Sequence, residues 1–440
     1  MKLGTNPGKP KSMDSVDRIS DLPDDILAHI LSFLSIKEAV HTCVLSKRWR
    51  NIWCYMPVLE FDFKKFYQDQ KAASYGEVLQ RCEVKFVPFV KGVLQNQEAC
   101  LDKFKLQWYM PCTFHTTKSV VEVILDVIKF KPRVFSVNFC RCYIQDFDLY
   151  PIFTCASLED VTLELTGDFK APNSVNLPNL KRLKISLEKI DDDIINNIFL
   201  GCPIIQEMSL FESHLCTSRI SSNRLKKLVV DNCYIDEEQW LEISTPSLLH
   251  LEIAYKSGLH SISSENLTSL TNACIDLQLP RGSKQATADD LTVLNCLSNV
   301  TSLALRIQES KESVVKINEK MKGDNSNHPF FPKLKSLRVE WCMDYFGFDL
   351  IAFFLQHSAK LQKLTIELHD YIKSVTKEGS SLEEPKDVLL QREHLETVMI
   401  VRSKLEESKK IGNQLVSSLN AHVNTIGEII TKIEPSILRL

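Results

Sequence analysis

The sequence predicts an α/β protein in which a short helical module precedes a long array of repeats whose parallel strands line a concave face. Two patterns support this fold class. Apolar residues recur at helical spacing between residues 22 and 53, and one short leucine-rich phrase returns many times after residue 134. The composition agrees, since 44% of the 440 residues are hydrophobic and 25% are charged, as in folded proteins.

The overall charge and the cysteines argue against several classes of protein. A formal net charge of −3 gives no general attraction to nucleic acid, and no run of 18 apolar residues predicts a membrane span. The first 17 residues lack the apolar stretch of a secretory signal. The 14 cysteines contain no C-x-x-C pair, so we expect no thiolate zinc site, and free thiols fit the reducing cytoplasm or nucleus.

Three short helices are predicted for the amino-terminal module. Pro23 suits the first turn of a helix whose apolar stripe follows at helical spacing, and Ser35 with Glu38 forms a capping box that opens the second helix. Ser46 can cap a third helix that carries Trp53. About 32 residues cannot bury so wide a stripe alone, because chains below roughly 40 residues rarely hold a core. The stripe must be covered by the rest of the chain or by another protein.

The same stretch resembles a known family. L-P-x-x-x-L-x-x-I-L-S-F-L, then E-A-V and V-L-S-K-R-W-R-x-x-W, is similar to the F-box of large plant families, although Ser35-Ile36 replaces the usual proline after the leucine. The resemblance implies a module that docks on the Skp adaptor of a cullin-RING ubiquitin ligase, with Trp49 and Trp53 bracing it. The adaptor-facing residues that it implies are Leu22, Pro23, Ile26, Leu27, Ile30, Leu31, Leu34, Val44 and Leu45.

The phrase apolar-x-x-apolar-x-apolar recurs through the long remainder. The first copies are spaced by 24, 22, 25, 20 and 23 residues, which matches the period of about 20–29 residues of a leucine-rich repeat. Cys142, Cys233 and Cys342 occupy the last slot of their copies, where a small side chain can be buried. Longer later gaps leave open a two-layer α/β fold with irregular βα units. The copies begin at Val134, Leu158, Leu180, Ile205, Leu225, Leu248, Leu270, Val300, Leu334, Leu361 and Leu395.

Strand alternation predicts which side chains face the concave side of such a solenoid. They carry both signs of charge, which favours a protein or peptide ligand, although each position read alone is an ordinary solvated strand residue. The predicted target-binding residues are Asp160, Thr162, Glu164, Arg182, Lys184, Glu207, Phe211, Lys227, Asp231, His250, Glu252, Arg338 and Glu340.

A second resemblance lies near the carboxyl end. "FPKLKSLRVEWC" and "LIAFFLQHSAKLQKLTIEL", between Phe331 and Leu368, resemble the terminal region of plant F-box/leucine-rich-repeat proteins of the FBD type. The match is partial, because residues 403–440 are predicted to be helical and to cap the solenoid. The predicted divisions are 1–16 flexible tail, 17–56 F-box, 57–133 junction and first units, 134–329 leucine-rich repeats, 330–402 FBD-like repeats and 403–440 helical cap. Predicted surface insertions are Pro280–Asp290, Glu309–Asn327 and Lys373–Lys386.

No catalytic motif is found, so we expect a non-enzymatic protein without cofactor or metal. G-x-S-x-G, H-E-x-x-H and P-loop patterns are absent, and Asp191 to Asp193 fit a helix cap. The two resemblances together imply a substrate-recognition subunit that joins an Skp adaptor, and through it cullin and RING subunits, to a target protein. Two alternatives remain: a binding module outside any ligase, and a receptor whose solenoid pocket senses a small molecule through Arg182, Lys184 and Lys227.

Overall fold

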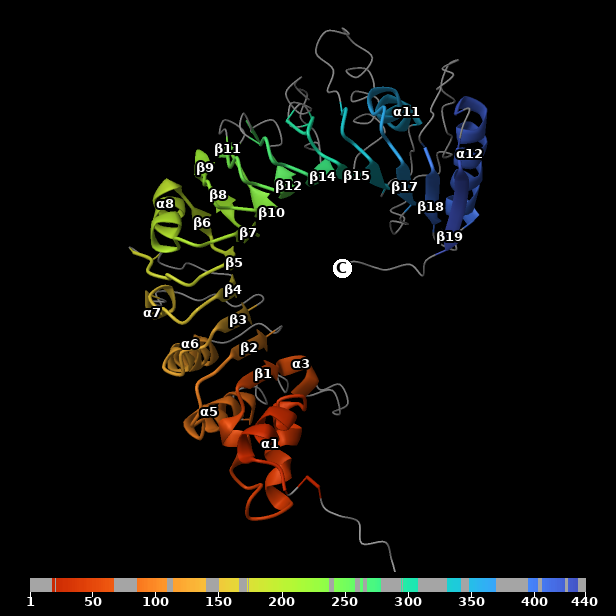
Figure 1. Ribbon diagram of the computed structural model, residues 1–440. Helices are drawn as coiled ribbons and strands as arrows, with labels where there is room; N and C mark the ends of the chain where they lie inside the picture. Colours follow the sequence, from red (N-terminus) through yellow and green to blue (C-terminus); the bar gives the residue numbers. More distant parts are fainter. Residues whose placement is uncertain are drawn as a thin grey trace, which may run out of the picture.

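The structure is a computed structural model of an arc of parallel strands with a helical module at one end (Figure 1). The predicted tail and all three predicted insertions lie outside the described residues. The structure describes residues 18–19, 21–66, 85–108, 114–139, 150–165, 172, 174–236, 241–257, 262–263, 267–277, 294, 296–307, 331–341, 348–368, 395–402, 406–423 and 426–433.

The amino-terminal module contains α1 (Asp24–Leu31), α2 (Ile36–His41) and the 3-10 turns η1 (Thr42–Val44) and η2 (Ile52–Tyr55). The capping box is confirmed: the Ser35 hydroxyl accepts from the Glu38 N–H at 3.3 Å, and the Glu38 carboxylate accepts from the Ser35 N–H at 3.0 Å. The predicted third short helix forms only in part: η2 carries Ile52 and Trp53, whereas residues 47–51 before it form turns. Pro57 disfavours helical backbone at the residue before it, and Met56 is extended.

One sheet of parallel strands runs through the whole arc, and its main path follows the order of the chain. This arrangement confirms the solenoid and excludes the two-layer alternative, which would reorder the strands. Along this path the strands are β1 (Val58–Asp62), β2 (Lys103–Trp108), β3 (Val134–Phe139), β4 (Asp160–Leu165), β5 (Arg182–Ser186), β7 (Glu207–Phe211), β10 (Lys227–Tyr234), β12 (His250–Ser257), β14 (Asn272–Leu277), β15 (Ser302–Ile307), β16 (Ser336–Trp341), β17 (Lys363–Leu368), β18 (Thr397–Arg402) and β19 (Glu428–Ile433).

The return segments on the outer side of the arc are of two kinds. Helices α5 (Val87–Gln95), α6 (Phe114–Ile128), α7 (Tyr150–Phe153) and α8 (Asp192–Gly201) lie outside the early strands (Figure 1). A helix is about 10 Å wide whereas neighbouring strands are about 4.8 Å apart, so outer helices bend the sheet into an arc.

In the middle coils, short strands take the place of outer helices. They form a separate three-stranded parallel sheet of β9 (Arg219–Ser221), β11 (Leu241–Ser244) and β13 (Ile262–Ser263). Two short strands, β6 (Lys189–Ile190) and β8 (His214–Leu215), pair with each other beside the main path. Further along, α11 (Phe348–His357) precedes β17, and the short helix α3 (Phe63–Phe66) follows β1.

The core is a continuous ladder of apolar side chains between the sheet and the return segments. Leu228 is 0% and Leu251 is 1% exposed, and they are paired neighbours on β10 and β12. The repeat also begins earlier than residue 134. Leu101, Phe104 and Leu106 make the same buried phrase on β2, with Phe in place of Leu at the middle position.

The carboxyl end differs from its prediction. Helix α12 (Glu406–His422) buries Leu415 and Leu419 as expected, but residues 428–433 form strand β19 and not helix. The open edge of β18 explains this, because its unpaired backbone groups bond to a parallel strand in the register Thr397 to Glu428. The solenoid therefore ends on a helix and one further strand.

Candidate functional site

An apolar surface is exposed on the amino-terminal module. Its members come from α1, η1 and the turns that follow each, and we call these six residues the docking face. Val44 is 82%, Phe33 78% and Leu45 65% exposed. Large apolar side chains exposed together in one short segment mark a candidate interaction site in a folded protein. The docking face consists of Ile26, Ile30, Phe33, Leu34, Val44 and Leu45.

Two of the nine implied adaptor-facing residues are placed differently. Leu27 is 0% and Leu31 is 2% exposed, because the inner side of α1 packs against η2. The expectation that they are accessible in the free chain is therefore wrong. Pro23 is exposed and Leu22 is half-buried.

Phe33 was missed in the list of adaptor-facing residues, although it stands in the quoted S-F-L. Helix α1 ends at Leu31, and the Phe33 N–H donates to the Ile30 carbonyl at 3.2 Å in the turn that follows. The turn carries the Phe33 ring outward, to 78% exposure. Phe33 does not fall at i, i+3, i+4 or i+7 from Leu27, so helical spacing did not select it.

The module is joined to the first coil by hydrogen bonds and a shared core. The buried Gln97 amide donates to the Met56 carbonyl at 3.0 Å, and the Glu98 N–H donates to the Cys54 carbonyl at 2.9 Å. Trp49 and Trp53 lie half-buried against the same core, which continues from α1 into β1 and β2. Docking face and solenoid are thus parts of one packed body.

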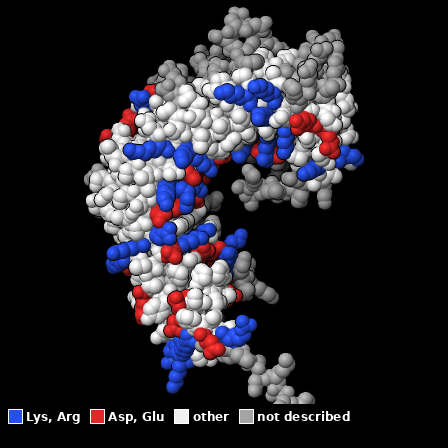
Figure 2. Space-filling view, in the orientation of Figure 1, with Lys and Arg blue, Asp and Glu red and all other residues white. Residues whose placement is uncertain are grey.

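The concave face carries the predicted target-binding residues, and Figure 2 shows charges of both signs along the inner side of the arc. All thirteen lie on β4, β5, β7, β10, β12 and β16, at positions that alternate with core residues. Glu340 is nevertheless only 8% exposed, because its carboxylate is held between arginines. Parallel register places the remaining side chains in rows along the arc.

Cations on the early part of this face are already neutralised. Arg182 pairs with Asp160 at 2.8 Å and Lys184 with Glu164 at 2.5 Å. The Lys184 ammonium also lies 4.5 Å from the centre of the Phe211 ring. These pairs argue against Arg182 and Lys184 as the anion-binding residues of a small-molecule pocket.

A network of ion pairs crosses the later part of the face from β12 to β17. Arg306 is its centre: its guanidinium lies 3.4 Å from Glu252 and 3.1 Å from Glu340. Arg338 continues the network to Glu340 at 3.2 Å and to Glu367 at 2.7 Å. His250 and Arg306 together hold the pKa of Glu252 below its usual value.

The sequence analysis did not include Arg306 among the face residues. It occupies the row of Glu340 on the neighbouring strand, so the alternation rule applied to the copy at Val300 would have placed it on the concave face. What alternation could not show is its reach. The side chain crosses β14 to contact Glu252 on β12, and it thereby ties several strands together.

Two of the described residues that could react, Cys233 and Asp191, have structural roles. Burial raises the pKa of Cys233 to about 12, and this cysteine fills its predicted slot at 0% exposure, whereas Cys142 and Cys342 lie outside the described residues. The Asp191 carboxylate caps α8 by accepting from the Ile194 N–H at 3.1 Å. Within the described ranges, no three His, Cys, Asp or Glu residues gather as metal ligands. None of the described helices has the length and apolarity to cross a membrane.

These features define a class of protein: a helical module with an open docking face, followed by a leucine-rich solenoid. Residues 19–61 match the family model of the F-box domain. Residues 137–317 match the family model described as "FBD-associated F-box protein At5g56370, LRR repeats". The chain thus contains an F-box domain followed by leucine-rich repeats, which the two resemblances predicted.

Three similar proteins of Arabidopsis thaliana carry the F-box in their names, two of them together with leucine-rich repeats. F-box/FBD/LRR-repeat protein At1g78750 is 25% identical over 428 residues, covering 93% of this chain and 89% of the relative. FBD-associated F-box protein At4g13985 is 28% identical over 422 residues, covering 92% and 87%. F-box/LRR-repeat protein 13 is 26% identical over 390 residues, covering 82% and 79%.

Proposed function

We propose that this chain is the substrate-recognition subunit of a Skp-cullin-F-box ubiquitin ligase. The docking face carries the proposal, because six exposed apolar side chains lie together in the short segment that matches the F-box domain. An F-box domain implies an Skp-type adaptor as partner, and an apolar adaptor surface would cover Val44 and Leu45. Cullin and RING subunits would join through that adaptor.

The contribution of the chain would be positioning. The shared core and the Gln97 and Glu98 hydrogen bonds hold the solenoid at a set orientation to the docking face. A target held on the solenoid would therefore meet the ubiquitin carrier at a raised effective concentration. Ubiquitin transfer itself would be performed by other subunits, so no side chain of this chain needs to react.

A pull-down with a plant Skp adaptor tests the first half of this proposal. Full-length protein should bind, and Val44→Asp and Ile30→Asp should each abolish binding without lowering the melting temperature, because both side chains are exposed. Leu200→Asp is the matched control, since Leu200 is 81% exposed on the solenoid, and it should bind normally. If the wild-type protein failed to bind the adaptor, the ligase proposal would be wrong, and the alternative of a binding module outside any ligase would replace it.

We further propose that the concave face holds the target. Mixed charges and the exposed parts of Phe211 and Arg338 would give such a surface specificity for a protein. Proximity labelling in plant cells with the ligase inhibited should identify candidates. A true target should bind Lys184→Glu and Arg338→Glu more weakly than wild type while the Skp adaptor binds both variants equally. Undiminished target binding by both variants would exclude this face.

A further inference from the structure

In the turns that lead into eight consecutive strands, one edge of the solenoid carries cations and no carboxylate, although one of the cations, Lys181, pairs with Glu159 at 2.8 Å. The four residues before each strand from β5 to β17 form the leading turns of these coils, and all are described. Acidic residues outnumber basic ones in the chain, 56 to 53, yet the leading turns contain six cations and no carboxylate. The six cations are Lys181, Arg224, Lys226, Lys333, Lys335 and Lys360.

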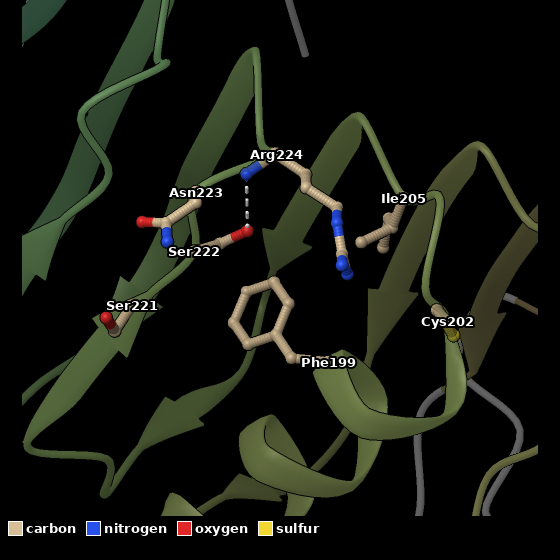
Figure 3. Close-up of a pocket in the computed structure, with 7 residues that line it drawn as sticks. All are labelled: Phe199, Cys202, Ile205, Ser221, Ser222, Asn223 and Arg224. Carbon is tan, nitrogen blue, oxygen red and sulfur yellow. Dashed lines mark hydrogen bonds between the residues drawn. The ribbon is translucent and has the colours of Figure 1, made fainter.

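A pocket of about 230 Å³ opens on this edge. It lies between the end of α8 and the turns before β7 and β10, and Figure 3 shows the Arg224 side chain extending into it, toward Phe199 and Ile205. Phe199 and Ile205 supply an apolar floor, and Ser221, Ser222 and Asn223 supply a polar rim. The Ser222 hydroxyl accepts from the Arg224 N–H at 3.3 Å, which fixes the turn.

The pocket is preformed on its helical side. Helix α8 ends at Gly201, where an added Cβ would lie 2.0 Å from the Val175 carbonyl oxygen. The Leu177 N–H donates to the Gly201 carbonyl at 2.9 Å. This close approach holds the last turn of α8, and with it Phe199, against the preceding coil.

Exposed apolar side chains surround the pocket. Leu200 follows Phe199 and is 81% exposed, and Ile204 precedes Ile205 and is 40% exposed. Leu249 is 43% exposed, and its N–H donates to the Lys226 carbonyl at 2.9 Å, so it lies beside the cationic turn. Neither Arg224 nor Lys226 forms an ion pair with another described residue, so both remain open to an anionic partner.

We propose that this edge is a second docking surface, which takes a protein segment carrying one large apolar side chain between carboxylates. The apolar side chain would enter against Phe199 and Ile205, and the carboxylates would meet Arg224 and Lys226. The surface lies on the edge and outer side of the solenoid, apart from both the docking face and the concave face. A partner held here could therefore bind together with an adaptor and a target.

Binding and not covalent chemistry is the role that this pocket supports. Its one thiol belongs to Cys202, which is 1% exposed, and burial raises the pKa of that thiol to about 12. The thiol therefore stays protonated at neutral pH and is a poor nucleophile.

Peptide display against the immobilised full-length chain tests the proposal. Enriched peptides should contain Leu, Phe or Met flanked by Asp or Glu, with affinities measured by fluorescence polarisation. Arg224→Glu/Lys226→Glu should weaken them about tenfold or more, and Ile204→Ser should weaken them severalfold. The matched control is Lys333→Glu/Lys335→Glu, which makes the same charge change on the same edge four strands away and should change affinity less than about twofold.

Three results would overturn the proposal. The proposed docking surface would be contradicted if no peptide were enriched, or if the enriched peptides lacked the acidic and apolar pattern. Equal weakening by the two double variants would show that only the overall charge of the edge matters. Unchanged affinity after the central apolar residue of the peptide is replaced by Ala would show a general polyanion site without a pocket.

Discussion

The docking face and the solenoid core are built from the same apolar residue types, yet they end in opposite environments. On the solenoid, Leu228 and Leu251 are at most 1% exposed, whereas Val44 on the module is 82% exposed. The difference follows from neighbours. A coil inside the array is covered by a coil on each side, whereas the module packs against the first coil on one side only. An uncovered apolar side is open to a partner, and this contrast separates the docking face from the solenoid core.

The largest expected effect on stability comes from a cavity in the solenoid core. Leu228→Ala should lower the free energy of unfolding by about 2–5 kcal/mol, because it leaves a cavity in a close-packed ladder. Val44→Ala removes apolar atoms that are already exposed to water, so it should change the free energy of unfolding by less than about 0.5 kcal/mol. Urea unfolding followed by circular dichroism measures both. Equal destabilisation by the two variants would mean that the docking face is not open in solution.

A smaller effect is expected on the concave face. Arg306→Met would leave the half-buried Glu252 and the buried Glu340 without their shared cation, at a cost of about 1–3 kcal/mol. Arg182→Met breaks an ion pair whose arginine is 50% exposed and should cost less than about 0.5 kcal/mol. Urea unfolding of both variants at neutral pH decides whether the Arg306 network braces the sheet. A cost for Arg306→Met as small as that for Arg182→Met would contradict this.

The same network predicts a dependence on pH. The pKa of Glu252 lies below its ordinary value of 4.5, so its contribution to stability is fully present above pH 4.5 and is lost as pH falls through the lower, folded-state value. The stability difference between wild type and Arg306→Met should therefore shrink as the pH falls below 4.5. Unfolding curves of both proteins at pH 7, 5 and 4 check the direction in which this stability difference changes. A difference that grows on acidification would contradict the assignment.

The smallest effect is local to the module. Ser35→Ala removes the side-chain half of the capping box and should destabilise α2 by about 1 kcal/mol, whereas Ser35→Thr should retain the cap. Hydrogen exchange should show faster exchange at the amides of α2 and no change in β10 or β12. Faster exchange throughout the solenoid would show that the module and the repeats unfold as one unit.

The sequence by itself determined the repeat and the capping box. The phrase period predicted a strand at each of the eleven copies, and Ser35 with Glu38 predicted the start of α2, because both signals are local and depend on residues a few positions apart. The helical stripe of the module was likewise visible. Its accessible members were not, since Leu27 and Ile30 belong to one stripe and only one of them is buried.

Only the tertiary structure decided which apolar side chains are covered and which distant residues come together. The packing of η2 and the first coil on α1 turned Leu27 inward and left Ile30 outward, and the open edge of β18 drew residues 428–433 into a strand. The reach of Arg306 across β14, and the pocket that α8 forms with two turns, likewise join residues distant in the chain. Periodicity reports which side of an element is apolar, but which apolar side is covered depends on what the fold brings beside it.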